Sequence, residues 1–76
     1  MREYLKALRE DRGLSAQDMA DMIGISCRYY QLIENGERQK KMDITLVKRI
    51  ANIFEVPLET IISNENKIMS KMLANN

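Results

Sequence analysis

The sequence predicts a compact all-α, five-helix domain, with a possible short C-terminal helix after it. Three observations support this fold class. Apolar residues recur at helical spacing in successive segments, no segment alternates like a strand, and a glycine or an Asn-Gly pair follows each of the first three segments. The chain has 76 residues, so we expect one domain with a small core that a partner chain would help to stabilise.

The first two helices are predicted over Arg2–Arg12 and Ala16–Ile23. Leucines one turn apart give the first helix an apolar face, and a glycine follows each helix as a natural stop. Ser15 and Asp18 have the spacing of a capping box, which marks the start of the second helix.

The third helix is predicted over Cys27–Glu34. Ser26 can accept hydrogen bonds from the free N–H groups at its start, and Asn35-Gly36 stops it. Gly24 can supply a left-handed turn just before this helix, and Ala20 is small enough for the second and third helices to cross closely. The two helices should therefore form a tight corner.

Two longer helices are predicted in the second half of the chain. Asp43 caps the fourth, and Pro57 lies at the start of the fifth, where its missing N–H costs least. The residues expected to pack inward are Ile44, Val47, Ile50, Ala51 and Phe54 in the fourth helix and Leu58, Ile61 and Ile62 in the fifth.

Residues 64–76 are predicted to form an extension beyond a domain at residues 1–63. An Asn-rich break precedes an apolar stripe at helical spacing, which suggests a short amphipathic helix. This helix could join two copies of the chain or pack back onto its own domain, and the sequence leaves both open. The stripe consists of Ile68, Met69, Met72 and Leu73.

The composition argues against catalysis and against a membrane protein. With no histidine and Cys27 as the only cysteine, neither a disulfide within the chain, nor a zinc site, nor a Cys/His nucleophile can be assembled. We expect no catalytic residue, no metal site and no cofactor. The charged start and the lack of a run of 18 apolar residues predict a cytoplasmic protein without membrane contact.

Charge is distributed unevenly along the chain. The formal net charge is only +1, yet residues 26–41 carry four basic and two acidic groups, whereas residues 1–25 carry four and five. The positive excess therefore surrounds the third predicted helix.

These segments resemble a known family. "LREDRGLSAQDMADMIGISCRYYQLIENG" and "LVKRIANIFEVPLETII" look like the Cro/phage-repressor type of helix-turn-helix domain, the xenobiotic-response-element family of bacterial regulators. The resemblance implies a lambda-repressor-like fold that binds double-stranded DNA, with the third helix in the major groove and the second across the phosphate backbone. It also implies that Arg9 pairs with Glu34, which would tie the first helix to the end of the third.

The outward face of the third helix is then expected to contact DNA. Helical spacing turns Tyr30 and Ile33 inward, which leaves the opposite face free. Arg28 could pair bidentately with guanine, although an ordinary solvated arginine is the alternative. Tyr29 could contact sugar and phosphate or be partly packed. The predicted DNA contacts in and beside this corner are Gln17, Ser26, Cys27, Arg28, Tyr29, Gln31, Leu32 and Asn35.

The segment "ERQKK" after the third helix is expected to meet the phosphate backbone through Arg38, Lys40 and Lys41, with a solvated loop as the alternative. So few cations should bind DNA weakly as a monomer. A homodimer would place two recognition helices about 34 Å apart on a palindromic site.

Two residues depart from the family pattern. Leu32 stands where arginine, lysine or glutamine is usual, and Ala16 replaces a glutamine that contacts the backbone in many members. Leu32 could contact a thymine methyl, or the face could bind a protein partner instead. The sequence therefore leaves two functions open. The first is a DNA-binding transcriptional regulator, a repressor of phage or mobile-element type, and the alternative is an antitoxin-like protein-interaction module.

Overall fold

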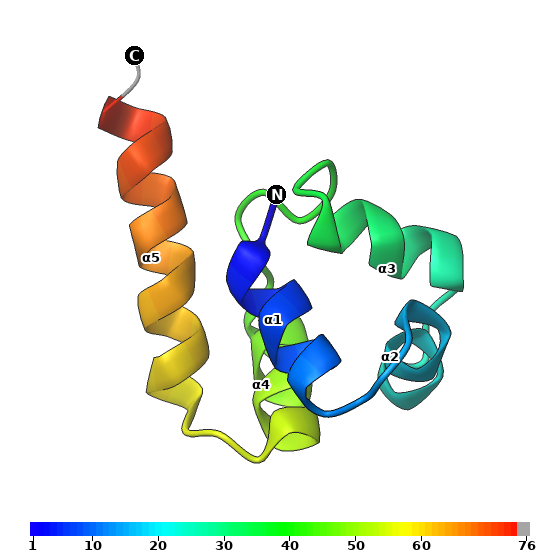
Figure 1. Ribbon diagram of the computed structural model, residues 1–76. Helices are drawn as coiled ribbons and strands as arrows, with labels where there is room; N and C mark the ends of the chain where they lie inside the picture. The colour runs from blue at the N-terminus through cyan, green and yellow to red at the C-terminus, as the bar shows by residue number, and fades with distance from the viewer. Residues whose placement is uncertain (75–76) are drawn as a thin grey trace.

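The computed structural model describes the backbone of residues 1–74 and the side chains of residues 1–70. This part of the chain contains five helices and no strand, which confirms the all-α fold class. In Figure 1, α1 and α4 occupy the centre, α2 and α3 lie on one side, and α5 runs along the other. The elements are α1 (Glu3–Asp11), α2 (Ala16–Ile23), α3 (Cys27–Glu34), α4 (Ile44–Phe54) and α5 (Leu58–Ala74).

The helix starts lie where the capping residues predicted them. At the start of α2, Ser15 accepts a hydrogen bond of 3.0 Å from the Asp18 N–H and donates its own N–H to the Asp18 carboxylate at 2.9 Å. Ser26 accepts from the Tyr29 N–H at 3.1 Å, and Asp43 caps α4 in the same way. These local bonds satisfy N–H groups that the first helical turn cannot.

The core packs the inner faces of α2, α3 and α4 against α1 and α5. Tyr30 and Ile33 are fully buried, as predicted, among Met19, Ile23 and the α4 side chains. The prediction for Ile44 is wrong, because this side chain is 52% exposed while Leu46 is buried. Ile44 lies on the predicted face but in the first turn of α4, which reaches past the edge of the core and borders an open groove.

The structure differs from the predicted Asn-rich break near residue 64. There α5 continues without interruption, so the segment expected as a separate short helix is the C-terminal part of α5. Asn64 Nδ2 donates to the Thr60 carbonyl one turn earlier at 2.7 Å, and Glu65 is buried. The Glu65 carboxylate accepts a hydrogen bond from Arg2, near the N-terminus, and this tertiary contact supports the helix where the local helix propensity is poor.

Candidate nucleic-acid interface

A tight corner joins α2 to α3. Gly24 adopts φ +90°, and the N–H groups of Gly24 and Ile25 both donate to the Ala20 carbonyl, at 2.8 and 3.0 Å. Ala20 is fully buried, which permits the close crossing that its small size predicted. Arg49 of α4 donates to the Ile23 carbonyl at 2.8 Å and so satisfies the end of α2. This contact was not predicted, because nothing local to Arg49 indicates it.

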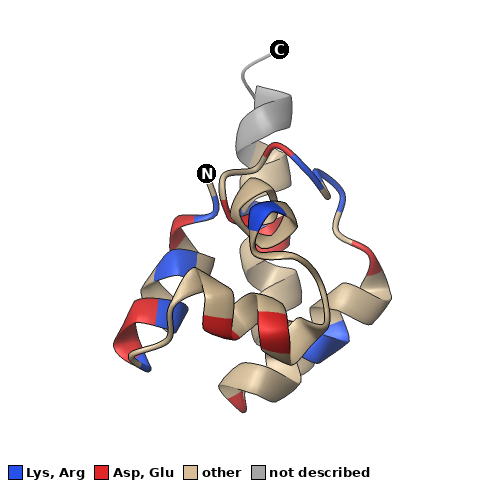
Figure 2. Ribbon diagram, turned by 90° about the vertical axis from the view of Figure 1, so that its right-hand side faces the viewer, with Lys and Arg blue, Asp and Glu red and all other residues tan. Residues whose placement is uncertain are grey.

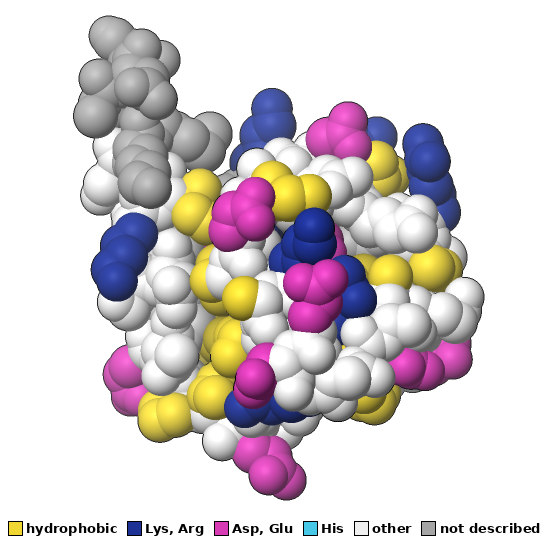
Figure 3. Space-filling view, in the orientation of Figure 1, with side chains coloured by type: hydrophobic (Ala, Val, Ile, Leu, Met, Phe, Trp, Pro, Cys, Tyr) yellow, Lys and Arg dark blue, Asp and Glu magenta, His cyan; other side chains and the backbone are white. Residues whose placement is uncertain are grey.

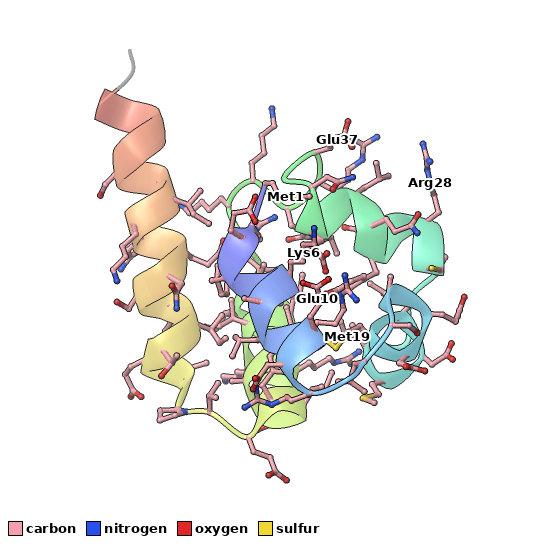
Figure 4. The ribbon with its side chains drawn as sticks, viewed as in Figure 1. Met1, Lys6, Glu10, Met19, Arg28 and Glu37 are labelled. Atoms are coloured by element: carbon pink, nitrogen blue, oxygen red, sulfur yellow. The ribbon has the colours of Figure 1, made fainter. Side chains whose placement is uncertain are left out.

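The predicted recognition residues share the outward side of this corner. Arg28, Gln31 and Asn35 are exposed, as is the cap Ser26. Cys27, Tyr29 and Leu32 are half-buried, and Cys27 is a free thiol packed at the edge of the core. Figure 4 shows Arg28 projecting away from the body of the protein at the N-terminal end of α3.

The surface is hollowed between α1 and α3. Arg28, Gln31, Leu32 and Asn35 line this hollow from α3 and its C-cap, and Ala16 reaches it from α2. Lys6 lines it from α1, as Figure 4 shows, and adds a cation that the sequence reasoning missed. In the sequence, Lys6 is indistinguishable from any solvated lysine of an amphipathic helix.

The loop after α3 carries exposed Arg38, Lys40 and Lys41. Gln39, at φ +54°, anchors this loop from within. Its side-chain amide donates to the Tyr29 hydroxyl at 2.9 Å and accepts from the Asp43 N–H at 3.1 Å. The Tyr29 hydroxyl therefore already has a partner within the protein, while its use as a DNA contact stays a prediction.

Charges divide this face into a basic and an acidic part. In Figure 2 the loop at the upper right is basic, whereas α2, below the end of α3, carries acidic residues. These are the exposed Asp18 and Asp21, and Gln17 donates to Asp21 at 2.8 Å. Hydrogen bonds from the backbone and then the side chain of Ser15 hold the pKa of Asp18 below its ordinary value. Phosphates would thus be attracted to the α3 and loop side more than to α2.

Behind the face, an ion pair anchors the end of α3 to α1, as the resemblance implied. Arg9 donates to both carboxylate oxygens of Glu34, at 3.0 and 3.1 Å, and to the Leu14 carbonyl at 2.9 Å. The Tyr30 hydroxyl donates to Glu34 at 2.6 Å. Burial of Glu34 favours its neutral form, but these bonds from Arg9 and Tyr30 outweigh burial and hold the pKa of Glu34 below its ordinary value.

Two apolar grooves flank α5. One lies between α5 and α1 and is visible in Figure 3, lined by Tyr4, Ala7 and Leu8. Of the predicted dimerisation residues, Met69 is 37% exposed and Ile68 is half-buried, while the side chains of Met72 and Leu73 lie outside the described residues. The other groove, between α4 and α5, contains Met69 with Met42, Ile44, Val47 and Ile62.

The corner, the partly buried Arg9–Glu34 pair and the outward polar face together define a helix-turn-helix domain. The family model for the helix-turn-helix matches residues 5–61, and the chain belongs to this family. Within the described part of the chain, no helix combines the length and apolar character that crossing a membrane requires.

Relatives with assigned names support this membership. The chain is 37% identical over 57 residues to the HTH-type transcriptional repressor RghR of Bacillus subtilis, covering 75% of this chain and 42% of that protein. It is 34% identical over 64 residues to the uncharacterized HTH-type transcriptional regulator YqaE of the same organism, covering 84% of this chain and 53% of that protein. The chain thus spans about half or less of the length of these relatives. No solved structure matched the chain significantly.

Proposed function

We propose that this chain is a sequence-specific transcriptional regulator that binds double-stranded DNA as a homodimer and reads the major groove with α3. The observation that carries the proposal is the outward side of α3, where polar side chains stand free beside a basic loop. Regulation by repression, as in the phage and mobile-element repressors that the sequence resembles, fits a small domain whose binding would block access to a promoter. RghR is named a repressor, which supports the same reading.

Base reading is assigned to the outward face of α3, from Arg28 to Leu32. The exposed guanidinium of Arg28 can donate two hydrogen bonds to guanine, and a bidentate contact of this kind discriminates by about 1–3 kcal/mol. Gln31 can pair with adenine in the same way. Leu32 lies half-buried in the hollow next to both, where its apolar surface suits a thymine methyl group.

Phosphate contacts are assigned to the loop. Arg38, Lys40 and Lys41 are exposed there, and each phosphate that they neutralise should steepen the fall of log K with log salt by about 0.9. Because α2 carries two exposed carboxylates, few contacts are expected from its side.

Dimerisation is assigned to α5 and the groove beside it. Met69 and Ile44 are large, exposed and apolar, and they line the same groove. A dimer presents twice the small set of cations to DNA, which compensates for the weak binding of one copy. Its two-fold symmetry predicts an inverted-repeat operator with half-sites about 34 Å apart.

The test is selection of bound sequences from a random duplex pool at fixed salt, followed by binding measurements on the selected site and on random DNA. Arg28→Ala should abolish most of the discrimination, whereas Lys40→Ala should weaken both duplexes about equally. Lys67→Ala is the matched control and should change neither, because Lys67 is exposed on α5 and does not line the groove assigned to dimerisation. Equal losses on both duplexes from Arg28→Ala and Lys40→Ala would reject the proposal.

The second candidate is a protein-interaction module on the same face, of antitoxin-like type. Leu32 and Ala16 favour it, because both place apolar surface in the hollow. Binding of a protein partner there would depend little on salt and would survive nuclease treatment, and Leu32→Lys would abolish it.

A further inference from the structure

A buried arginine near the N-terminus connects three distant parts of the chain. Arg2 is only 3% exposed and lies just before α1. Its guanidinium donates to both carboxylate oxygens of Glu65 in α5, from Nε at 2.9 Å and Nη2 at 3.1 Å. It also donates to the carbonyls of Ile33, at 2.5 Å, of Arg38, at 3.2 Å, and of Gln39. These contacts use all five N–H groups of the guanidinium.

The carboxylate side of this cluster is equally well bonded. Glu65 is 8% exposed and also accepts from the Tyr4 hydroxyl at 2.5 Å. The backbone N–H of Arg2 donates to the Glu34 carbonyl at 2.8 Å. Arg2 is therefore held by both its side chain and its backbone, so its guanidinium is a fixed point.

Of the three carbonyls that Arg2 binds, that of Ile33 lies at the end of α3, and those of Arg38 and Gln39 lie in the first part of the basic loop. The N–H groups of Glu37 and Arg38 donate to the Leu32 carbonyl at 2.9 and 3.2 Å, which folds the loop back over α3. Gln39 follows at φ +54°, a left-handed conformation that a residue with a side chain disfavours. Arg2 binds the carbonyl of this residue and so stabilises the loop where its backbone is least favourable.

We propose that Arg2 is a positioning residue for DNA binding. It fixes the backbone of the loop against the end of α3, so that Arg38, Lys40 and Lys41 stand beside the reading face, and Glu65 holds Arg2 in place. The inference rests on the proposed function, because the loop is taken to contact phosphate. Lysine cannot replace Arg2, since an ammonium group lacks the planar fork that reaches three carbonyls and a carboxylate together.

Arg2→Lys tests this role, and Arg12→Lys is the matched control. Arg12 also donates to a backbone carbonyl, that of Phe54 at 2.8 Å, and lies 5.2 Å from the Phe54 ring centroid. Arg12 is the C-cap of α1, and the C-terminal end of α1 lies on the opposite side of the molecule from the loop that follows α3 (Figure 1). Both changes keep the charge and remove a fork. The Arg12 side chain is 33% exposed and makes fewer bonds than that of Arg2, so Arg12→Lys controls for the loss of an arginine fork far from the loop and not for the loss of a fully buried one.

Two readouts separate positioning from simple stabilisation. The first is the affinity of the full chain for its selected duplex, by fluorescence anisotropy at several salt concentrations, where circular dichroism shows every variant folded. Arg2→Lys should weaken binding about tenfold and lower the salt slope by about 0.9–1.8 per subunit, since one or two phosphate contacts are lost. The second is amide hydrogen exchange in the free protein, where Glu37 and Arg38 should exchange faster. Arg12→Lys should leave both readouts unchanged.

A folded Arg2→Lys variant with the wild-type affinity, salt slope and loop protection would overturn the inference. If Arg2→Lys does not fold, Glu65→Gln is the second variant, because glutamine keeps the shape of the acceptor while removing its charge. Glu65→Gln should show the same two effects in weaker form, and wild-type affinity, salt slope and loop protection in Glu65→Gln would also overturn the inference. If the wild-type chain binds no duplex at all, the proposed function falls. Exchange of the Glu37 and Arg38 amides then still decides whether Arg2 fixes the loop.

Discussion

Replacing Glu34 by leucine should be among the most damaging single changes in this domain. The substitution would leave the Arg9 guanidinium, whose side chain is 14% exposed, without its carboxylate, and the buried Tyr30 hydroxyl without an acceptor. Breaking a fully buried pair from one side costs about 3–5 kcal/mol, because the remaining charge stays buried and uncompensated. This pair is partly buried and Arg9 keeps its bond to the Leu14 carbonyl, so we expect a loss at the lower end of that range. At about 0.05–0.15 kcal/mol per residue, a domain of 76 residues has roughly 4–11 kcal/mol in total, so the loss is a large part of it.

A double-mutant cycle isolates the pair itself. Arg9→Met should cost a similar amount, since Glu34 would keep only the hydrogen bond from Tyr30. The combined Arg9→Met, Glu34→Leu variant buries no unpaired charge, so it should recover about 1–3 kcal/mol relative to the sum of the single changes. Urea unfolding followed by circular dichroism at pH 7 and moderate salt measures all four free energies of unfolding.

The exposed ion pair between Arg12 and Asp11 provides the control. Their atoms are 3.8 Å apart and the Asp11 side chain is 82% exposed, so Asp11→Asn should change the free energy of unfolding by less than about 0.5 kcal/mol. Single losses below about 1 kcal/mol at Arg9 and Glu34, or additive effects in the cycle, would refute the anchoring role of the pair.

Further changes test the pH dependence, the corner and the dimer. The pKa of Glu34 is lowered in the folded state, so its contribution to stability is present above its unfolded pKa of about 4.3 and is lost as the pH falls below it. The melting temperature should therefore fall between about pH 5 and pH 3, and Glu34→Gln should make this fall smaller. Gly24→Ala should cost about 1–2 kcal/mol from φ alone, since the added Cβ would lie 4.0 Å from Arg49. Ser26→Ala should cost about 0.5–2 kcal/mol in urea unfolding. Met69→Lys should shift sedimentation toward the monomer while the helical circular dichroism signal at about 20 °C or below stays that of the folded chain, because Met69 is exposed in the single copy.

Local signals predicted most of the fold, and the exceptions depend on tertiary contacts. Caps such as Ser15 and Ser26 act within three residues, so the helix starts could be read directly from the sequence. The face of α4 was also readable, but the point at which the core ends is not, which is why Ile44 was misplaced. Continuity of α5 depends on Glu65, whose partner Arg2 lies 63 positions away in sequence.

The candidate site divides in the same way. Helical periodicity separated the buried side of α3 from the outward side that carries Arg28, because the two sides differ in polarity. Lys6, Gln39 and Arg49 were missed, because their roles arise from elements that only the fold brings together.

The anchoring of α3 is unequal along its length. Its C-terminal end is held from two directions, by Arg9 through Glu34 and by Arg2 through the Ile33 carbonyl. At its N-terminal end, the corner and the cap Ser26 fix the backbone, while the side chain of Arg28 projects freely. A rigid backbone lowers the entropy that α3 would lose on entering a groove. Under the proposed function, the free end would select bases, and the Arg2 anchor, which also binds the loop carbonyls of Arg38 and Gln39, would position the basic loop for phosphate contact.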